Sequence, residues 1–420
     1  MSSDTPALVL ASQKNIVILG GSYSGISTAH YLLKHAIPQL PGKGSSYQIV
    51  LVSPSPQVIC RPACPRALIS DTMFDQKKLF VSIPNAFEQY PKNNFRFVNG
   101  AAVELDHVER TVSVSLTVGS NTEKIAFHAL IIATGASTPS PLLGLNRDDD
   151  FLRTSWAAFR SALPIAKSIV IAGGGPAGIE TAGELGEYLN GRSGANLANP
   201  KVSITVVTAG SEILPALRPS IARKAEEFLA MVGVTVVKNA RVETVVPEGA
   251  GTDSIATKAK LILDNGSTLE ADLYIPATGT IPNTSFINKE FLTADGRVDT
   301  NASTLRVNKA GPRIYAVGDV GSYSRPAIHL ILDAIPILCT NIKRDLLLAT
   351  GREESSVGED RVFKPDLRET QMVPIGKNKG VGAAMGFQLP SFMVWLIKGR
   401  DYWLWTTGGL WSGKQWAKES

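Results

Sequence analysis

Cysteine, histidine and long runs of one kind of residue are scarce in this sequence. Three cysteines in 420 residues are too few for a disulfide-held scaffold, so we expect a reducing, cytoplasmic compartment. Lysine and arginine are dispersed, and the net charge of +5 includes no basic run that could follow a phosphate backbone. We therefore expect no nucleic-acid partner, and we predict no metal site.

Long apolar runs are also missing, because glycine, proline or a charge interrupts each of them before it could cross a bilayer. The opening segment, MSSDTPALVLASQK, lacks a basic stretch before an apolar core and predicts a short tail rather than a targeting peptide. No glycine follows Met1, so an N-myristoyl anchor is not encoded. The length and the 44% hydrophobic content indicate an ordinary globular protein of two or three domains.

Two segments share one strand–turn–helix pattern: NIVILGGSYSGISTAHYL and SIVIAGGGPAGIETAGEL. In such a unit the first glycine permits a tight turn, the second lets the backbone approach a pyrophosphate, and the third lets the helix pack on the strand. The helix N-terminus then faces the phosphates. The second copy is complete at Gly173, Gly175 and Gly178, whereas the first has Ser22 between Gly20 and Gly25. One imperfect copy could be a plain turn, but two copies predict two bound nucleotides.

Three further turns follow apolar strand patterns. LIIATGAST ends a buried-strand run at Thr134 and Gly135, and YIPATGTIPN repeats this ATG turn through Gly279. RIYAVGDVGSY places Gly318 and Asp319 after another strand. A carboxylate at a strand end can accept hydrogen bonds from a polyol chain, although an isolated aspartate there is also typical of a turn.

The order of these motifs resembles the flavoprotein pyridine-nucleotide oxidoreductases, in which an inserted NAD(P)H domain splits an FAD domain. PRAL at 65–68, GGGPAGIE at 173–180 and KGRD at 398–401 are similar to the apoptosis-inducing-factor-like branch. That branch includes the ferroptosis suppressor flavoproteins, and type II NADH dehydrogenases are more distant kin. The resemblance covers nearly the whole chain from residue 15 onward. It implies an α/β fold with two Rossmann-like dinucleotide-binding domains.

The resemblance also implies the domain boundaries. We expect the FAD-binding domain at 1–142 and 276–345, the NAD(P)H-binding domain at 143–275, and a C-terminal interface or cap region at 346–420.

The cofactor-binding residues are likewise implied by the resemblance. FAD would be bound by the first cradle and by later strand ends: Gly20, Gly21, Ser22, Tyr23, Ser24, Gly25, Ser53, Arg66, Ala102, Thr134, Gly135, Gly318 and Asp319. NADH or NADPH would be bound by the second cradle: Gly173, Gly175, Pro176, Ala177 and Gly178. Gly279 is also implied as a cofactor-binding residue. Ser53 is a departure, because many relatives carry an acid there for the adenine ribose.

The strand after the second cradle bears on the choice between NADH and NADPH. VSITVVTAGS ends in Thr208, Ala209 and Gly210, without the carboxylate that binds a 2′-hydroxyl in NAD-type units. Arg218 and Arg223 follow, and either could reach a 2′-phosphate or belong to a solvated helix surface. Both cofactors stay open, with a lean to NADPH.

Cys60 and Cys64 lie close to where disulfide reductases of this superfamily keep a redox pair. In those enzymes four residues separate the cysteines, and a histidine near the C-terminus is the acid–base partner. Here only Arg61, Pro62 and Ala63 intervene, and no histidine follows His329. Thiolate chemistry without a base is poorly supported, so we interpret both cysteines as small apolar fillers beside the flavin.

Without a thiol relay, electrons would pass from the flavin directly to an acceptor. Glu180 could orient the nicotinamide or border the acceptor pocket, or it could only complement the helix dipole. Lys398 matches a lysine of the branch that lies near the flavin, where it could stabilise negative charge; the alternative is a surface lysine. We predict that Glu180 and Lys398 are the catalytic residues of an FAD-dependent NAD(P)H oxidoreductase with a quinone-like two-electron acceptor.

The C-terminal segment FMVWLIKGRDYWLWTTGGLWSGKQW contains five of the six tryptophans. It could form an acceptor pocket, a homodimer seam, a peripheral membrane contact or a packed cap over the flavin domain. Two alternative functions also stay open. One is a tailoring oxidoreductase for an aromatic small molecule in secondary metabolism, and the other is a nicotinamide-sensing flavoprotein with little turnover.

Overall fold

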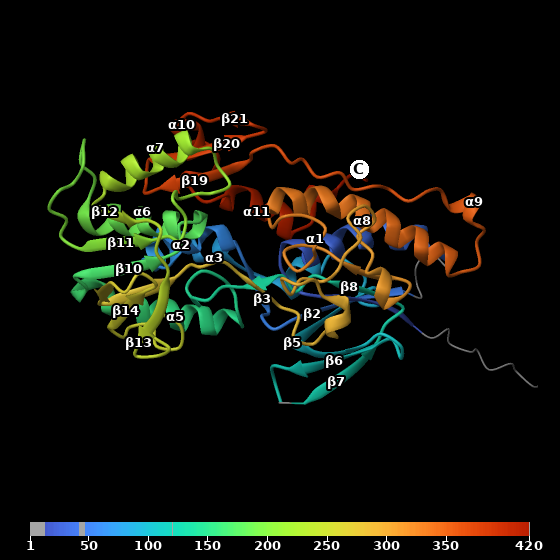
Figure 1. The fold of residues 1–420 in the computed structure, drawn as a ribbon. Coiled ribbons are helices and arrows are strands. Elements are labelled where there is room, and N and C mark those ends of the chain that lie inside the picture. Colours follow the sequence, from blue (N-terminus) through green and yellow to red (C-terminus); the bar gives the residue numbers. More distant parts are fainter. Residues whose placement is uncertain (1–12, 42–46, 120, 420) are drawn as a thin grey trace, which may run out of the picture.

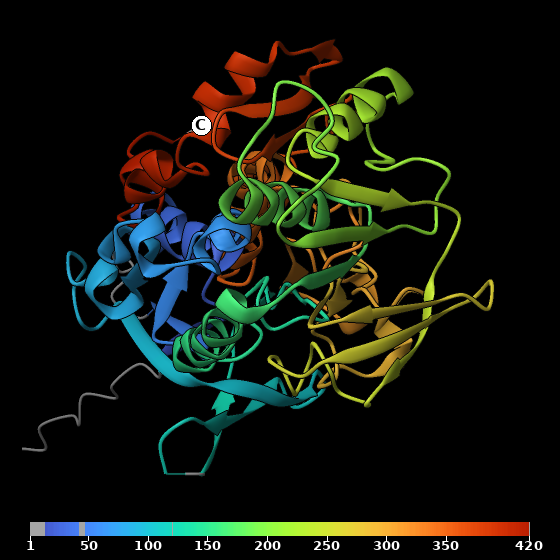
Figure 2. The ribbon, with the colours of Figure 1, turned by 90° about the vertical axis from the view of Figure 1, so that its left-hand side faces the viewer.

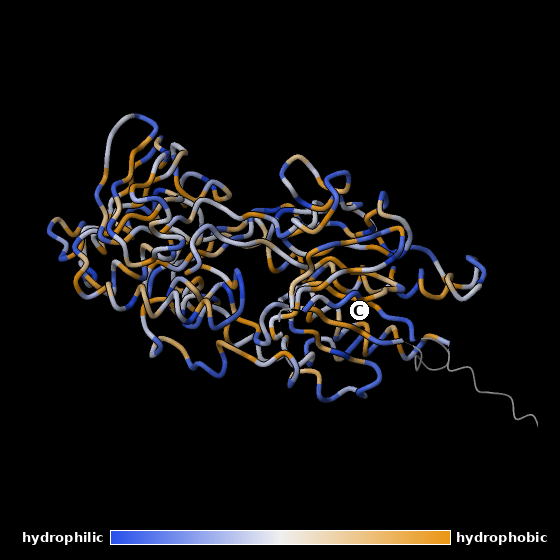
Figure 3. The backbone as a smooth tube through the Cα atoms, turned by 90° about the horizontal axis from the view of Figure 1, so that it is seen from below, coloured by the Kyte–Doolittle hydropathy of each residue, from blue (hydrophilic) through white to orange (hydrophobic). Residues whose placement is uncertain are grey.

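The computed structural model of the chain describes residues 13–41, 47–119 and 121–419. The opening segment, for which the sequence predicts a short tail, lies almost entirely outside the described residues. The described chain forms two lobes side by side (Figure 1). Seen from below, apolar stretches run through both lobes and hydrophilic stretches follow many of the outer loops (Figure 3).

A seven-stranded sheet forms the first lobe, in the order β18-β8-β1-β2-β5-β6-β7. The five strands from β18 to β5 are parallel, and the apolar runs of β18, β8, β1 and β2 are largely buried, as a parallel sheet covered by helices requires. β18 comes from a distant part of the chain, so the chain returns to this sheet after building the second lobe. The strands are β1 (Lys14–Leu19), β2 (Tyr47–Ser53), β5 (Phe95–Asp106), β6 (Thr111–Leu116), β7 (Thr122–Ala126), β8 (Ala129–Ile132) and β18 (Ile314–Ala316).

Helices α1 (Tyr23–Tyr31) and α8 (Ile328–Leu348) pack on each other beside this sheet. Ile26 and Ala29 of α1 share one buried cluster with Ile335 and Leu338 of α8. Short elements complete this part of the structure: β3 (Gln57–Ile59), α2 (Cys64–Ala67), α3 (Gln76–Leu79), β4 (Phe80–Ser82), α4 (Ile83–Phe87), β9 (Ala136–Ser137) and β17 (Ile281–Pro282). β9 and β17 pair where the chain leaves and re-enters the first lobe.

The second lobe contains a four-stranded parallel sheet, in the order β12-β11-β10-β16. Helices α5, α6 and α7 share one buried cluster with Ile169 and Ile171 of β10. The opposite side chains, including Val170 and Val207, pack on Leu261 of an antiparallel sheet, β13-β14-β15. The elements are α5 (Asp149–Ala162), β10 (Ser168–Ala172), α6 (Pro176–Asn190), β11 (Ser203–Val207), α7 (Pro219–Ala230), β12 (Val234–Val237), β13 (Val242–Val246), β14 (Ala259–Leu263), β15 (Thr268–Ala271) and β16 (Leu273–Pro276).

This architecture confirms the expected α/β fold with two Rossmann-like units. Each parallel sheet has a strand–turn–helix unit at its centre, β1–α1 in one lobe and β10–α6 in the other. The domain boundaries at 142, 275 and 345 stay predictions.

From β19 onward the C-terminal region packs on the second lobe, as Figure 2 shows at the top of the molecule. A Cβ atom on Gly183 of α6 would lie 2.8 Å from the Cα atom of Ile375, so only glycine allows β19 to approach this helix so closely. The elements are β19 (Gln371–Ile375), β20 (Lys379–Ala384), β21 (Phe387–Gln388), α10 (Ser391–Val394), the π-helix η9 (Trp395–Gly399) and α11 (Leu404–Trp411).

The chain then returns to the first lobe. Trp411 and Trp416 are buried in the same cluster as α1, and their carbonyl oxygens lie 2.8 Å from the Nε2 atoms of His30 and His35, respectively. These two tryptophans form part of a packed cap, whereas Trp405 is 58% exposed. The C-terminal region therefore bridges the two lobes.

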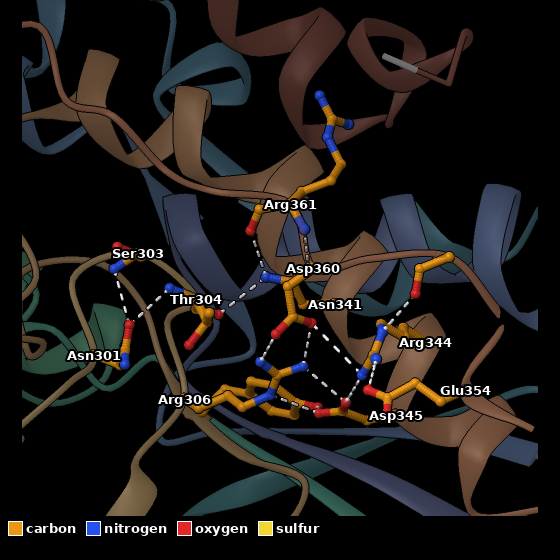
Figure 4. Close-up of polar contacts among 12 residues, drawn as sticks. Asn301, Ser303, Thr304, Arg306, Asn341, Arg344, Asp345, Glu354, Asp360 and Arg361 are labelled. Atoms are coloured by element: carbon orange, nitrogen blue, oxygen red, sulfur yellow. Dashed lines mark hydrogen bonds and ion pairs between the residues drawn. The ribbon is translucent and has the colours of Figure 1, made fainter.

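A network of ion pairs fixes the long connection between α8 and β19 (Figure 4). Arg306 forms ion pairs with Asp345 at 2.7 Å and with Asp360 at 2.6 Å. Asn341 donates to the carbonyl oxygen of Arg361 at 2.9 Å, and its own side-chain oxygen accepts from the Arg361 backbone N–H at 2.8 Å. These contacts hold the connection, which contains the short helix α9 (Glu354–Val357).

Candidate functional site

A cavity of about 1030 Å³ lies at the carboxyl ends of both parallel sheets, and residues of both glycine cradles and both ATG turns line it. Ligands of open α/β sheets bind at this edge. The cavity therefore brings together most of the residues that the sequence predicts for the site. These lining residues are Gly20, Gly21, Ser22, Tyr23, Ser24, Ser53, Thr134, Gly135, Gly173, Gly175, Pro176, Ala177, Glu180, Gly279, Asp319 and Lys398.

The two cradles have the same geometry. Gly20 has φ +119°, and a Cβ atom there would overlap the carbonyl oxygen of Ala133 in the first ATG turn. Gly173 has φ +130°, and a Cβ atom there would overlap the carbonyl oxygen of Ala277 in the second. In each copy the ATG turn thus packs directly on the first glycine, which explains why the two motifs occur together.

The helices that follow the cradles fit phosphate groups. Within the described residues, neither α1 nor α6 has a side-chain cap or an acidic residue in its first turn, so their first N–H groups are available to an anion. A Cβ atom on Gly175 would meet nothing within 4 Å, so the middle position of a cradle tolerates a side chain. Ser22 occupies this position in the first cradle, lines the cavity, and can donate a hydrogen bond to a phosphate oxygen.

Some predicted residues lie away from the cavity lining. Gly25 and Gly178 lie behind the cradles, where a Cβ atom would overlap the carbonyl oxygen of Gly20 or Gly173. Gly318 has φ +89° and supports the turn before Asp319. Ala102 is half-buried on β5 and does not belong to the lining, because its strand continues into the antiparallel pairing with β6, so its contact with FAD stays a prediction.

Arg66 is also absent from the lining, because its guanidinium is engaged elsewhere. It donates from Nε and Nη2 to the two carboxylate oxygens of Glu184 at 2.8 and 2.7 Å, and both side chains are buried. The Tyr402 hydroxyl donates to the same carboxylate at 2.9 Å, and Arg66 reaches the carbonyl oxygen of Arg400 at 3.3 Å. These contacts form a buried junction between α2, α6 and the C-terminal region, and a direct contact of Arg66 with FAD stays a prediction.

Glu180 lies one helical turn before Glu184, and it pairs with Lys398. The Lys398 Nζ atom donates to Glu180 Oε1 and, at 3.0 Å, to the carbonyl oxygen of Met372. Glu180 is 3% exposed and Lys398 is 6% exposed, yet both line the cavity. Burial raises the pKa of Glu180 to about 7, although Lys398 opposes the shift. The structure thus joins the two predicted catalytic residues in one ion pair, which the sequence did not predict.

Asp319 lines the cavity near an arginine that the sequence reasoning missed. Arg61 Nη1 lies 3.8 Å from Asp319 Oδ2 and donates to the carbonyl oxygen of Ala136 at 3.0 Å. Burial raises the pKa of Asp319, against the attraction of Arg61. Arg61 stands between Cys60 and Pro62, in a segment that the sequence reasoning used only for its two cysteines.

Cys60 and Cys64 are free and fully buried, and neither belongs to the cavity lining among the described residues. Burial raises the pKa of the Cys60 thiol to about 11 and that of the Cys64 thiol to about 12. The Cys60 Sγ atom accepts from the Tyr23 hydroxyl at 3.5 Å. Thiols of this kind are rarely ionised near neutral pH, which supports the interpretation of the pair as apolar fillers.

The two arginines considered for a 2′-phosphate lie outside this cavity. Arg218 forms an ion pair with Glu369, with its Nε atom 2.8 Å from Oε2. Arg223 lines a separate cleft on α7. Arg241, which the sequence reasoning did not consider, lines the main cavity together with Thr208.

Comparison with known proteins identifies the family. The family model "Pyridine nucleotide-disulphide oxidoreductase" matches residues 14–335. The chain belongs to this family. It is an oxidoreductase whose cofactors are FAD and NADH or NADPH. The resemblance to apoptosis-inducing-factor-like proteins is confirmed, because the relatives include ferroptosis suppressor protein 1 and apoptosis-inducing factor 1 of Saccharomyces cerevisiae.

Among the relatives of this oxidoreductase is oxidoreductase phnG of Penicillium herquei, with 64% identity over 97% of this chain and 98% of that protein. Oxidoreductase ptaL of Pestalotiopsis fici is 30% identical over 92% of this chain and 95% of its own length. Human ferroptosis suppressor protein 1 is 27% identical over 92% of this chain and 93% of its own length.

Solved structures share the fold of this oxidoreductase. The sulfide:quinone oxidoreductase of Aquifex aeolicus superposes with a TM-score of 0.69 at 18% identity, covering 95% of this chain and 92% of that chain. The NDH2 of Plasmodium falciparum in complex with NADH has a TM-score of 0.63 at 15% identity, covering 97% and 99%.

Residues 13–41, 47–119 and 121–419 contain no group of three His, Cys, Asp or Glu side chains placed to hold a metal ion. In the same residues, no helix has both the length and the apolar character needed to cross a membrane.

Proposed function

We propose that this oxidoreductase transfers two electrons from NADH or NADPH to a quinone-like acceptor. FAD binds at the first cradle and the dinucleotide at the second, within an FAD unit of residues 1–142 and 276–345 and an NAD(P)H unit of residues 143–275. The observation that carries the proposal is the single cavity shared by both cradles and by the Glu180–Lys398 ion pair. A cavity that two nucleotides share is what direct transfer between them requires.

The cofactors supply the redox chemistry: FAD, when bound, accepts hydride from the nicotinamide and passes two electrons to an acceptor. The chain supplies position and electrostatics. The uncapped N-termini of α1 and α6 bind the phosphate groups, and Asp319 accepts hydrogen bonds from the polyol chain.

Glu180 and Lys398 supply a proton and a positive charge at the cavity wall. Reduction of a quinone to a quinol takes up two protons, and a carboxyl group with a pKa of about 7 can release and regain one near neutral pH. Lys398 is only 6% exposed, so its ammonium group acts on negative charge at the cavity wall with little screening by water. The pair is suited to an acceptor that gains electrons and protons together.

Lys398 lines the cavity and belongs to a C-terminal segment with several exposed apolar side chains, which favours a lipid-type quinone. Lys398 and the 37% exposed Trp395 belong to the same π-helix, η9. Six large apolar side chains between residues 385 and 405 are exposed: Met385, Phe387, Phe392, Trp395, Leu396 and Trp405. Exposed aromatic residues with nearby arginine are typical of membrane-interface contacts. We therefore propose peripheral contact with a membrane through this segment.

The test is reduction of the purified FAD-loaded protein by each dinucleotide, followed by reoxidation with a panel of acceptors. We expect benzoquinones and naphthoquinones to reoxidise it with multiple turnover, and liposome flotation to recover part of the protein with the vesicles. If only hydroxylated aromatic compounds reoxidise the protein rapidly, the acceptor is a tailoring substrate and not a quinone. Slow turnover with every acceptor, with a redox-dependent mass in light scattering, would favour the sensing role. The same scattering measurement determines whether the chain forms a homodimer.

A further inference from the structure

The end of β11 is where a Rossmann unit distinguishes NADH from NADPH, because the adenosine ribose lies there. In this protein that strand end consists of Thr208, Ala209 and Gly210, and all three residues line the cavity. A carboxylate at this place binds the 2′-hydroxyl of NADH and repels a 2′-phosphate. Neither effect is available here, so the strand end does not disfavour NADPH.

A second segment is fixed against the same strand end. The backbone N–H of Asn239 donates to the carbonyl oxygen of Gly210 at 3.1 Å, and that of Ala240 donates to the carbonyl oxygen of Thr208 at 3.1 Å. These bonds hold the loop after β12 on the tip of β11. The next residue, Arg241, consequently lines the cavity beside the ribose position.

The guanidinium of Arg241 has no partner within the described part of the chain. Its backbone N–H donates to Asp264 Oδ1 at 2.9 Å, but its side chain makes no hydrogen bond or ion pair there. The neighbouring cation Lys238 forms an ion pair with Glu226 at 2.7 Å. Arg218 is held by its own carboxylate partner.

The other cations in the cavity lining are engaged. Lys398 pairs with Glu180, and Arg61 lies 3.8 Å from Asp319. Arg147 stacks on the ring of Phe151, 4.5 Å from its centroid. Among the described cavity residues, Arg241 is therefore the cation whose side chain has no hydrogen bond, ion pair or ring contact, and its loop is held at the strand end beside the second cradle.

We propose that this oxidoreductase selects NADPH and that Arg241 binds its 2′-phosphate. The inference rests on the proposed function, because it specifies the dinucleotide that the second cradle takes. A guanidinium presents paired N–H donors that match two phosphate oxygens, and such charge-assisted bonds are stronger than neutral ones. The loop bonds to Thr208 and Gly210 hold the Arg241 backbone at the strand end before the ligand arrives.

The first measurement compares NADP⁺ with NAD⁺ by isothermal titration calorimetry on the FAD-loaded protein. We expect NADP⁺ to bind more tightly, and Arg241→Ala to weaken NADP⁺ binding by roughly 10- to 100-fold while leaving NAD⁺ binding within about twofold. Arg241→Lys should retain part of the preference, because it keeps the charge and loses the paired donors. Steady-state kcat/KM for NADPH and NADH should change in the same proportions.

A matched control and a second variant separate this site from general effects of charge. Arg223→Ala removes an exposed arginine outside the cavity, and we expect the preference for NADPH to be unchanged. Ala209→Asp places a carboxylate at an exposed position of the strand end, and we expect it to favour NADH. Added salt should weaken NADP⁺ binding more than NAD⁺ binding in the wild type, but not in Arg241→Ala.

The outcomes distinguish the inference from the proposed function. Equal or tighter binding of NAD⁺ by the wild type, or an unchanged preference in Arg241→Ala, would overturn the inference even if quinone reduction is rapid. Selective binding of NADP⁺ through Arg241, without reduction of any acceptor, would support the inference and overturn the proposed quinone activity instead.

Discussion

Replacing Lys398 by alanine removes the cation that neutralises a buried carboxylate. Removing one partner of a buried ion pair costs about 3–5 kcal/mol if the other group stays charged. Glu180 can avoid that cost, because burial already raises its pKa to about 7 and the loss of Lys398 moves the pKa further up. The variant is therefore expected to take up a proton at neutral pH.

The stability of the variant should depend on pH with a definite sign. A carboxyl group whose pKa is raised by folding contributes stability at pH values below its unfolded pKa, and this contribution is lost as pH rises through its folded pKa. In the wild type the loss ends near pH 7, whereas in Lys398→Ala it continues to higher pH. The free energy of unfolding of the variant should thus decrease relative to the wild type by about 1.4 kcal/mol for each pH unit between 7 and the new pKa of Glu180.

The assay combines denaturation across a pH series with steady-state reduction of a soluble quinone. We expect Lys398→Ala to retain FAD and to lose turnover by about 100-fold, because a positioned charge is missing from the cavity wall. Lys414→Ala, which alters an exposed lysine of the same C-terminal region, is the control. An unchanged turnover rules out the role of Lys398 at the site, and a pH-independent stability difference refutes the coupling to Glu180.

Arg66→Met should lower the unfolding free energy by about 3–5 kcal/mol, measured by denaturant titration, because its buried glutamate partner is left uncompensated. Wild-type stability in this variant would show that the junction is dispensable. Gly173→Ala should weaken dinucleotide binding by roughly tenfold or more in calorimetry, because the new methyl group overlaps the second ATG turn. Gly175→Ala should retain more affinity, because its methyl group faces open space. The opposite order would contradict the cradle geometry. The double variant Cys60→Ser with Cys64→Ser should keep turnover within about twofold, since buried thiols with pKa values of about 11 and 12 take no part in the reaction. A large loss of turnover in a folded, FAD-containing variant would support a redox role for the two cysteines instead.

The parts of the fold that follow from local rules could be predicted from the sequence. A cradle needs glycine where the backbone has positive φ and where a Cβ atom would overlap a neighbouring carbonyl oxygen, so Gly20 and Gly173 mark their turns. The paired ATG turns follow from the same packing. Ser22 looked like a defect in the first cradle, but the open space at the equivalent Gly175 shows that this position accepts a side chain.

The parts that depend on contacts between distant segments could not be predicted. Glu180 and Lys398 were each singled out, but they are 218 residues apart, and their pairing depends on how the C-terminal region packs on α6. The engagement of Arg66 by Glu184, across 118 residues, has the same origin. Arg241 has no sequence signal, because the hydrogen bonds that carry its loop to the end of β11 are made by backbone atoms.

We propose that one cavity holds two nucleotides close enough for direct electron transfer. Anaerobic titration of the FAD-loaded protein with NADPH and with NADH, monitored by the visible flavin absorbance, tests it most directly. We predict that one equivalent of NADPH bleaches the flavin rapidly and that a quinone restores the colour. A folded protein that takes up no FAD, or bound FAD that neither dinucleotide bleaches, would contradict the account.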